Sequence, residues 1–225
     1  MLQTPSESGP DRTCPGPTAD PRSRPGFTLI ELTVVLAVIV TLALVLTPSI
    51  ANFINDSRAA RARTDCQTIA AAVVQFYRDT GFFPQWTAAR GGGAGLADSR
   101  LQLLVSPGNP PLEDVPTLWS TGKAGLIGDQ LVNNQAGYAL RSPSTQLGWN
   151  GPYLTSELGT DPWGRRYVVN IGLIDTSPGT VTAAGTVKGA VWVLSAGPNG
   201  TVETPYTQSV LTAQLYGDDI GQRIQ

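Results

Sequence analysis

The stretch FTLIELTVVLAVIVTLALVL, residues 27–46, decides the fold of this chain. It is twenty residues long and contains a single charged side chain, Glu31. A helix of about 20 apolar residues is long enough to cross a hydrocarbon layer roughly 30 Å thick. A conventional secretory signal has a shorter apolar centre with small residues after it, whereas here the small residue, Gly26, comes before the run. The stretch therefore predicts a membrane-spanning helix rather than an ordinary signal peptide.

The segment before this stretch, residues 1–26, has the composition of a disordered leader. It contains six prolines and almost no large apolar side chains. Such a segment cannot bury enough apolar surface to offset the entropy lost on ordering. We therefore expect a boundary between a leader, 1–26, and the membrane half of a first helix, 27–47.

The helical pattern continues through residues 48–80. Small and apolar residues recur there at steps of three and four, which places them on one face of a helix. This stripe consists of Ala59, Ala62, Cys66, Ile69, Val73 and Phe76. Four charged residues lie off the stripe and are expected to face water: Arg58, Arg61, Arg63 and Asp65. Gly81 supplies a usual helix stop, so the helix is expected to end near residues 79–81.

Pro48 divides this helix into a membrane half and a soluble half. Proline lacks an amide donor and clashes with the preceding turn, so a bend or local melting is expected there. The alternative is a complete helix break at the membrane boundary. A continuous helix over 27–79 would be about 80 Å long at 1.5 Å per residue, far longer than a membrane crossing requires.

The remainder of the chain divides into a loop region, 81–164, and a strand-rich region, 165–225. The loop region is rich in glycine and proline, and its short apolar pieces indicate small helical turns. β-Branched and aromatic residues at 165–172 and 189–194 predict strands, and loop residues follow from Ser195. We expect an antiparallel sheet of about three strands packed on the helix stripe, and thus an α+β fold.

Composition excludes several classes of function. The net charge is −2 and the pI is near 5.1, which argues against a protein that neutralises nucleic-acid phosphates. The chain contains no histidine, so catalytic triads, Cys–His dyads and most zinc sites are excluded. Its two cysteines are Cys14 and Cys66. Removal of the leader leaves one, with no internal disulfide, and Cys66 is expected to pack as a small apolar residue.

The residues RPGFTLIEL at 24–32 resemble the processing site of type IV prepilins and type II secretion pseudopilins. The cleavage glycine, the phenylalanine, the glutamate spacing and the apolar run all occur together. The resemblance implies that a membrane peptidase, the prepilin peptidase, cuts after Gly26 and methylates the new N-terminus at Phe27.

The rest of the chain resembles one branch of that family, the major pseudopilin (G subunit) of the type II secretion system. The resemblance implies the pilin-like fold, in which a long N-terminal helix with a transmembrane first half packs on a small antiparallel sheet. The region between Pro84 and Trp149 is longer than this branch leads us to expect. The matching segments are FYRDTGFFP at 76–84, WNGPYL at 149–154, DPWGRRY at 161–167, VLSAGPNG at 193–200 and GDDI at 217–220.

Glu31 is the candidate assembly residue. A carboxylate within lipid costs at least ~2.5 kcal/mol on insertion scales, and such residues usually have a partner. Cleavage after Gly26 creates one, the positive α-amine of Phe27, four residues away. The resemblance implies that this pairing joins neighbouring subunits and sets their axial register. The alternative is a glutamate at the headgroup boundary that extends to water.

The terminal loop is the candidate metal site, since the resemblance implies calcium there. Hard cations take several oxygen ligands, often carboxylates mixed with backbone carbonyls. The proposed ligands are Leu194, Asn199, Asp218 and Asp219. Many relatives carry an aspartate three residues after the leucine, where this chain has Gly197. The alternative is a solvated acidic turn without metal.

The leading hypothesis is a structural subunit rather than an enzyme. Its homo-polymer would form a periplasmic pseudopilus together with minor pseudopilins and an inner-membrane assembly platform. The resemblance implies a single inner-membrane pass with a cytoplasmic N-terminus and a periplasmic head. The alternatives are a type IV pilin, a competence pseudopilin, and an enzyme or binding module on an uncleaved signal anchor. The candidate carboxylates for that last class show no catalytic spacing: Glu113, Asp114, Glu157 and Asp161.

Overall fold

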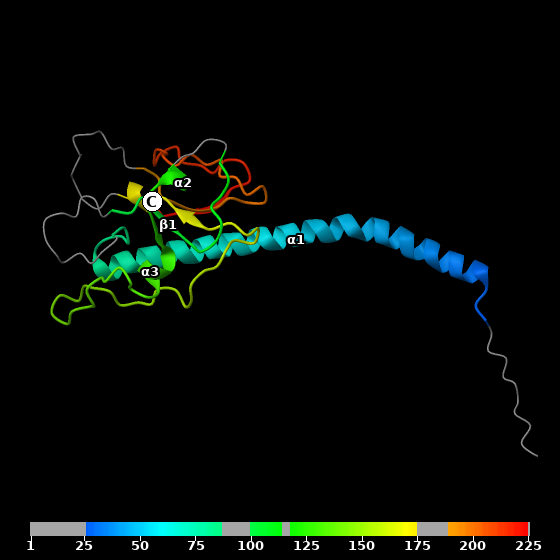
Figure 1. Cartoon of the computed structure of the whole chain (residues 1–225), viewed down its shortest axis with the longest axis horizontal. Coiled ribbons are helices and arrows are strands. Elements are labelled where there is room, and N and C mark those ends of the chain that lie inside the picture. The colour runs from blue at the N-terminus through cyan, green and yellow to red at the C-terminus, as the bar shows by residue number, and fades with distance from the viewer. Residues whose placement is uncertain (1–25, 87–99, 114–117, 175–188, 225) are drawn as a thin grey trace, which may run out of the picture. The chain divides into compact units, whose positions relative to one another are not determined.

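The chain divides into two compact units, Met1–Ser49 and Ile50–Gln225. The computed structural model describes residues 26–86, 100–113, 118–174 and 189–224, without the side chains of Pro48 and Ser49 (Figure 1). The predicted leader therefore lies almost entirely outside the described residues, and its boundaries stay a prediction.

Helix α1 covers Leu29–Thr80, 52 residues. At its start the Glu31 backbone N–H donates to the Thr28 side-chain oxygen at 3.2 Å. At its end Gly81, with φ of 78°, donates its N–H to the Tyr77 carbonyl, a left-handed stop that favours glycine. The prediction that the helix continues past Pro48 and stops near residues 79–81 is confirmed.

The sheet has five strands in the order β2-β1-β3-β4-β5. Strands β1 and β2 are parallel, and the other three pairings are antiparallel. The strands are β1 Leu103–Val105, β2 Ala124–Leu126, β3 Val168–Val169, β4 Trp192–Ser195 and β5 Ile220–Arg223. The short helical elements are α2 Leu118–Thr121, α3 Ile127–Leu131 and the 3-10 turn η2 Ile171–Leu173.

The predicted α+β fold, a long N-terminal helix packed on a small sheet, is confirmed, and the sheet differs in detail. It is a mixed sheet of five strands, not an antiparallel sheet of about three. Strands β1 and β2 lie in the region predicted as loop, and β5 lies in the terminal segment read as loop. These strands have three or four residues each, too few for a period-two pattern, and they form because neighbouring strands offer hydrogen-bonding partners.

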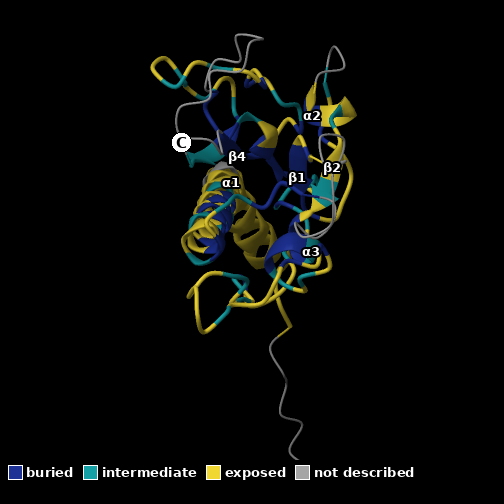
Figure 2. Ribbon diagram, turned by 90° about the vertical axis from the view of Figure 1, so that its left-hand side faces the viewer, coloured by how far each residue is buried: buried dark blue, intermediate teal, exposed yellow. Residues whose placement is uncertain are grey.

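The two faces of the sheet bury different side chains. Leu104, Val169 and Val193 stand in register across β1, β3 and β4 and share one apolar cluster with α1. The alternate residues point to the opposite face, as the pleat requires, and pack there with Trp119 and Tyr206. Strands β1 and β4 are buried throughout, as Figure 2 shows in dark blue.

The predicted helix stripe forms the α1 side of this core. Ala62, Cys66, Ile69, Val73 and Phe76 are fully buried, and Ala59 is half-buried. The Phe76 ring has three aromatic neighbours, the rings of Phe82, Tyr138 and Tyr153, with centroids 5.9, 4.8 and 5.4 Å away. The stripe prediction is therefore confirmed, because the sheet and these rings cover it.

The charged residues beside the stripe follow the prediction with one exception. Arg58, Arg61 and Arg63 are exposed. Asp65, predicted to face water, is half-buried instead, because it accepts a hydrogen bond of 2.7 Å from the Tyr167 hydroxyl. Asp65 also lies 3.6 Å from the Arg61 guanidinium. The carboxylate thus links α1 to the residue before β3.

Cys66 packs as an apolar residue, as predicted. Its side chain is fully buried, and its thiol donates to the Ile220 carbonyl with sulfur and oxygen 3.7 Å apart. Burial raises the pKa of the Cys66 thiol to about 12. The side chain therefore stays neutral and fills a place between α1 and β5.

The Asp161 carboxylate ties a loop to the end of β4. Its Oδ1 accepts the backbone N–H groups of Trp163 and Arg165 at 3.0 and 2.8 Å. Its Oδ2 accepts the Ser195 hydroxyl at 2.6 Å. Each oxygen of this buried carboxylate is therefore satisfied within the fold.

Candidate functional site

The predicted cleavage glycine lies in open space. A Cβ atom built on Gly26 would meet nothing within 4 Å, and the residue is exposed. The fold around Gly26 therefore leaves room for a side chain. A requirement for glycine at this position must come from an event other than folding.

The residues after Gly26 start the helix through a capping arrangement that the sequence reasoning missed. Phe27 is 84% exposed. Thr28 accepts the Glu31 backbone N–H on its hydroxyl and the Leu32 N–H on its carbonyl, both at 3.2 Å. The signal was present, because threonine followed three residues later by glutamate is the capping-box pattern. Glu31 thus lies in the first turn of α1, where negative charge is favoured.

The predicted pairing of Glu31 is left open by this structure. Before cleavage the Phe27 nitrogen belongs to a peptide bond and carries no positive charge. Glu31 is exposed, and the ion pair found in the described part of the chain is that of Arg61 with Asp65. The structure therefore places Glu31 on the first turn and leaves its carboxylate accessible to a partner.

The first half of α1 presents an uncovered apolar surface. Every large apolar side chain from Phe27 to Leu46 exposes at least half of its area. Among the described residues, α1 is the one helix long and apolar enough to cross a membrane. Because so large an apolar surface is unfavourable in water, lipid or other protein must cover it.

The predicted metal loop centres on two adjacent carboxylates before β5. The Oδ2 atom of Asp219 accepts the backbone N–H groups of Glu203 and Thr204 at 3.0 and 2.7 Å. Its side chain is 7% exposed, and burial raises the pKa of Asp219 to about 6. Its Oδ1 atom is buried and accepts no hydrogen bond from the described part of the chain.

Asp218 repeats this arrangement. Its Oδ2 accepts the Asn199 backbone N–H at 3.0 Å, and its buried Oδ1 likewise has no donor among residues that the structure describes. The Asn199 side-chain amide donates to Glu203 at 2.5 Å, and its oxygen accepts the Thr201 N–H at 2.6 Å. The structure therefore brings Asn199, Asp218 and Asp219 together.

Glu203 is a member of this cluster that sequence reasoning missed. A Cβ built on Gly217, which has φ of 59°, would lie 2.5 Å from the Glu203 carboxyl group. Glycine at 217 therefore allows that carboxylate to lie against the backbone just before Asp218. The sequence contains no signal for this contact, because Glu203 and Gly217 belong to separate loop segments.

Leu194 occupies a different position from the other predicted ligands. It lies inside β4, paired with Val168 on one side and Gly221 on the other, and its side chain is buried. In such an interior strand each carbonyl is directed at a neighbouring strand. A ligand role for the Leu194 carbonyl stays a prediction.

The acid loop, here Asn199, Glu203, Asp218 and Asp219, fits a hard cation in its donor chemistry. Two buried carboxylate oxygens that accept no donor from the described residues are costly, and a hard cation is a partner suited to such oxygens. Within the described ranges, no group of three or more His, Cys, Asp or Glu side chains is arranged to hold a metal ion. A bound ion would therefore need backbone carbonyl or water oxygens in addition to the carboxylates.

Gly197 brings the segment after β4 close to the segment that contains Asp218. Its φ is 65°, and a Cβ added there would collide with the Asp218 backbone carbonyl and lie 3.1 Å from the Asp218 carboxyl carbon. An aspartate has no room at this position. The two loop segments approach each other through glycine, so carboxylates for an ion must come from elsewhere in the loop.

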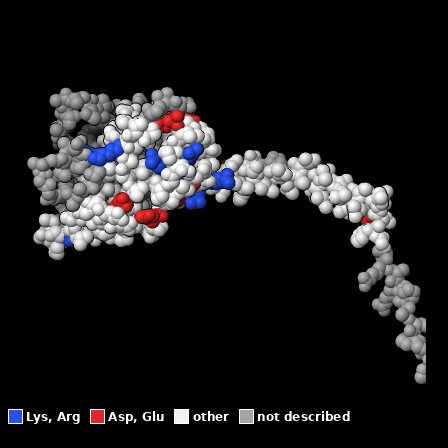
Figure 3. Space-filling model, viewed as in Figure 1, with Lys and Arg blue, Asp and Glu red and all other residues white. Residues whose placement is uncertain are grey.

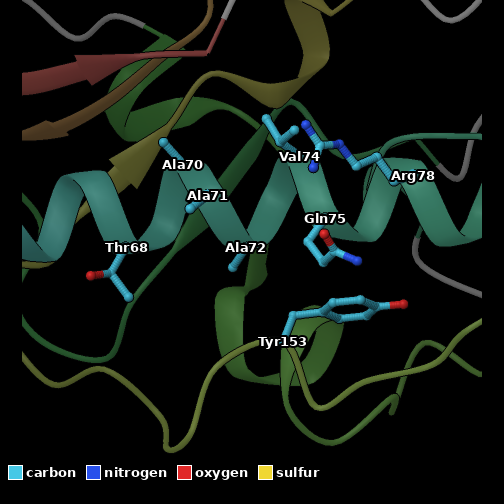
Figure 4. Close-up of a pocket in the computed structure, with 8 residues that line it drawn as sticks. All are labelled: Thr68, Ala70, Ala71, Ala72, Val74, Gln75, Arg78 and Tyr153. Atoms are coloured by element: carbon cyan, nitrogen blue, oxygen red, sulfur yellow. The ribbon is translucent and has the colours of Figure 1, made fainter.

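A pocket lies beside the soluble half of α1. Small and polar side chains of the helix line it, together with Tyr153, and Gln75 points toward the tyrosine ring (Figure 4). The candidate carboxylates form separate structural contacts: Glu113 accepts the Ser120 hydroxyl, and Glu157 accepts the Asn133 amide. Asp114 lies outside the described residues.

Comparison with known proteins identifies one feature. Residues 21–47 match the model of the prokaryotic N-terminal methylation motif. No curated protein and no solved structure matches the chain. The motif supports a type IV pilin-like or pseudopilin subunit, a structural class that the prepilin peptidase processes and that polymerises into filaments. With its apolar helix, it is consistent with a single-pass membrane anchor.

The approach of Gly197 to Asp218 predicts that Gly197→Asp destabilises the protein. A side chain in the left-handed region costs about 1–2 kcal/mol, and the collision adds to this, so we expect the melting temperature to fall by roughly 4–8 °C. Gly159→Asp is the control, because a Cβ at Gly159 meets nothing within 4 Å. Thermal unfolding of both variants measures the difference, and equal melting temperatures would contradict the close approach.

Proposed function

We propose that the chain is a pseudopilin, a structural subunit of a periplasmic pseudopilus that drives protein export through a type II secretion system. The observation that carries the proposal is the coincidence of two features in one helix. The methylation motif covers residues 21–47, and the same segment exposes every large apolar side chain that follows Gly26. A processing signal joined to an uncovered apolar helix suits a subunit that leaves the membrane by polymerising.

The assembly step follows from charge in an apolar environment. The peptidase cuts after Gly26 and methylates Phe27, which frees a positive secondary amine at the start of α1. The Glu31 carboxylate of a neighbouring subunit neutralises that amine, because opposite charges attract strongly where water is excluded. A subunit out of register leaves two unpaired charges in lipid, so the pair sets the axial position of each new subunit.

The choice of a secretion system over a pilus rests on the head. The end-of-helix, loop and terminal-loop segments at 76–84, 149–154, 161–167 and 193–200 resemble those of the major pseudopilin. A type IV pilin often carries a C-terminal disulfide, and the chain after Gly26 has a single cysteine, Cys66. A competence pseudopilin needs a route to DNA binding, and the net charge of −2 argues against a surface that neutralises nucleic-acid phosphates.

The proposal also includes the partners of the subunit and its location in the cell. The partners are further copies of this chain, minor pseudopilins, the prepilin peptidase and an inner-membrane assembly platform. The helix half at 27–47 spans the inner membrane once, with its N-terminus in the cytoplasm and the head in the periplasm. The subunit itself catalyses no reaction.

Processing is tested by the mass of the protein purified from its native membrane. We expect the mass of residues 27–225 plus one methyl group. Gly26→Leu should abolish cleavage, because the peptidase requires glycine at this position while the fold does not. The uncleaved protein would migrate more slowly on a gel, since it keeps the 26-residue leader. Gly159→Leu, at another open glycine, should be cleaved normally. A native chain that still begins at Met1 would instead favour a protein held by an uncleaved anchor.

The role of Glu31 is tested with Glu31→Gln. Glutamine keeps the capping-box hydrogen bond and removes the charge, so helix formation and membrane insertion should persist. Filament yield should fall at least tenfold, since breaking a buried ion pair costs about 3–5 kcal/mol. Asp56→Asn, which removes an exposed carboxylate elsewhere on α1, is the control. Normal filaments from Glu31→Gln would rule out the pairing.

The acid loop supports calcium as the ion of the head. The carboxylates of Asp218 and Asp219 would hold it through the Oδ1 atoms that have no donor in the described structure. Asn199 and Glu203 lie at the same loop and add oxygen atoms nearby. The bound ion supplies positive charge that joins the two loop segments around these carboxylates.

Calcium should raise the melting temperature of the purified chain in detergent. At a free concentration of about 100 times Kd the ion contributes about 2.7 kcal/mol, which corresponds to roughly 5–10 °C for a head of this size. The double variant Asp218→Asn, Asp219→Asn should lose this response, whereas Asp129→Asn should keep it. Scanning calorimetry with calcium, magnesium or chelator measures the shift, and an unchanged melting temperature for the parent chain would remove the metal proposal.

A further inference from the structure

The first residues of the second unit, Ile50–Arg63, form a helical segment, here called the collar, which is exposed except at Ala59 and Ala62. Its N-terminal part is apolar. Ile50, Phe53 and Ile54 are 56%, 74% and 44% exposed, although the core of the head starts only a few residues further on, at Ala62. These large side chains lack a cover within the described structure and need one.

The C-terminal part of the collar is basic. Arg58, Arg61 and Arg63 are exposed, and Asp56 is the one acidic residue in the segment. The collar therefore has a net charge of +2, three arginines less one aspartate, in a chain whose net charge is −2. Figure 3 shows basic side chains gathered on α1 where it enters the head.

Apolar and basic residues share one face of this helix. Ile50, Ile54, Arg58 and Arg61 follow at steps of four, four and three, the spacing of side chains that lie above one another on a helix. Arg61 lies 3.6 Å from Asp65, and its side chain is 65% exposed. An exposed ion pair of this kind is weak, so the guanidinium is available to another anion.

The order of these residues along the helix, apolar first and basic second, matches the change from acyl chains to headgroups at a membrane surface. Phenylalanine and isoleucine are favourable at the boundary between acyl chains and headgroups, and arginine extends its charge to the polar side. Anionic lipids attract basic residues close to the bilayer. Three residues of chain separate the collar from Leu46 at the end of the apolar stretch, so the collar follows the proposed membrane span directly in sequence.

We infer that the collar binds anionic phospholipid headgroups through Arg58 and Arg61, with Ile50, Phe53 and Ile54 seated at the acyl boundary. The inference rests on the proposed insertion of the apolar half of α1 into a membrane and on the bend expected at Pro48. Without a bend, Arg61 would lie about 22 Å beyond Leu46 along the helix; with one, the collar lies along the membrane surface. The contact holds the head of a subunit at the membrane surface before the subunit enters a filament. The collar arginines have to leave their lipid headgroups when the subunit enters a filament.

The test measures thiol labelling of the full chain, carrying Cys14→Ser, at one copy per lipid nanodisc. Ser57→Cys places a thiol on the collar, Val38→Cys places one in the apolar half, and the native Cys66 is fully buried. An uncharged water-soluble maleimide is the probe. Discs contain either phosphatidylglycerol or phosphatidylcholine, at low salt.

We expect the collar thiol to react at least about fivefold more slowly in phosphatidylglycerol than in phosphatidylcholine, from the attraction of arginine to an anionic surface. High salt should reduce the ratio. The double variant Arg58→Gln, Arg61→Gln should bring it below about twofold. Arg78→Gln, Arg141→Gln, which removes two exposed arginines outside the collar, should leave it unchanged.

Two results would overturn the inference in distinguishable ways. Equal collar rates in both lipids, or a ratio that the collar variant leaves intact, with Val38→Cys protected in each, would reject the headgroup contact and leave the membrane anchor standing. Rapid labelling of Val38→Cys in both lipids would reject insertion itself, and the collar contact with it.

Discussion

The rest of this structure depends on an apolar helix surface that the described part of the chain leaves uncovered. From Phe27 to Leu46 every large apolar side chain is exposed, and water is an unfavourable environment for that surface. A bilayer or other apolar helices can cover such a helix. Both are provided in turn by the proposed cycle of insertion and polymerisation. The charged exception, Glu31, then becomes informative, because a carboxylate is tolerated in those surroundings when it has a partner.

The second half of the same helix is covered by the head. The stripe from Ala62 to Phe76 is buried against the sheet and a ring of aromatic side chains. Strand β5 connects this packing to the acid loop: Asp219 is followed at once by Ile220, whose carbonyl accepts the Cys66 thiol. The acid loop therefore adjoins a residue that contacts α1.

Two features of the fold could not be predicted from local sequence patterns. Asp65 was expected in water because charged residues beside an apolar stripe usually are, but the Tyr167 hydroxyl, 102 positions away, holds it at the head surface. Strands β1 and β5 were expected to be loops, because three or four residues carry no periodic signal. Both are strands because β3 and β4 lie beside them. In each case the deciding partner is distant in the chain.

The sequence by itself determined the long helix, the burial of its soluble face, the end of the helix at Gly81 and the candidate processing residues Gly26, Phe27 and Glu31. These features depend on periodicity, composition and contiguous motifs, which are local properties. Only the tertiary structure decided the mixed topology of the sheet, the addition of Glu203 to the acid loop and the need for glycine at 197. Each of those depends on a contact between two segments that are distant in the sequence. The sequence of either segment alone does not show which atoms the other segment brings to that contact.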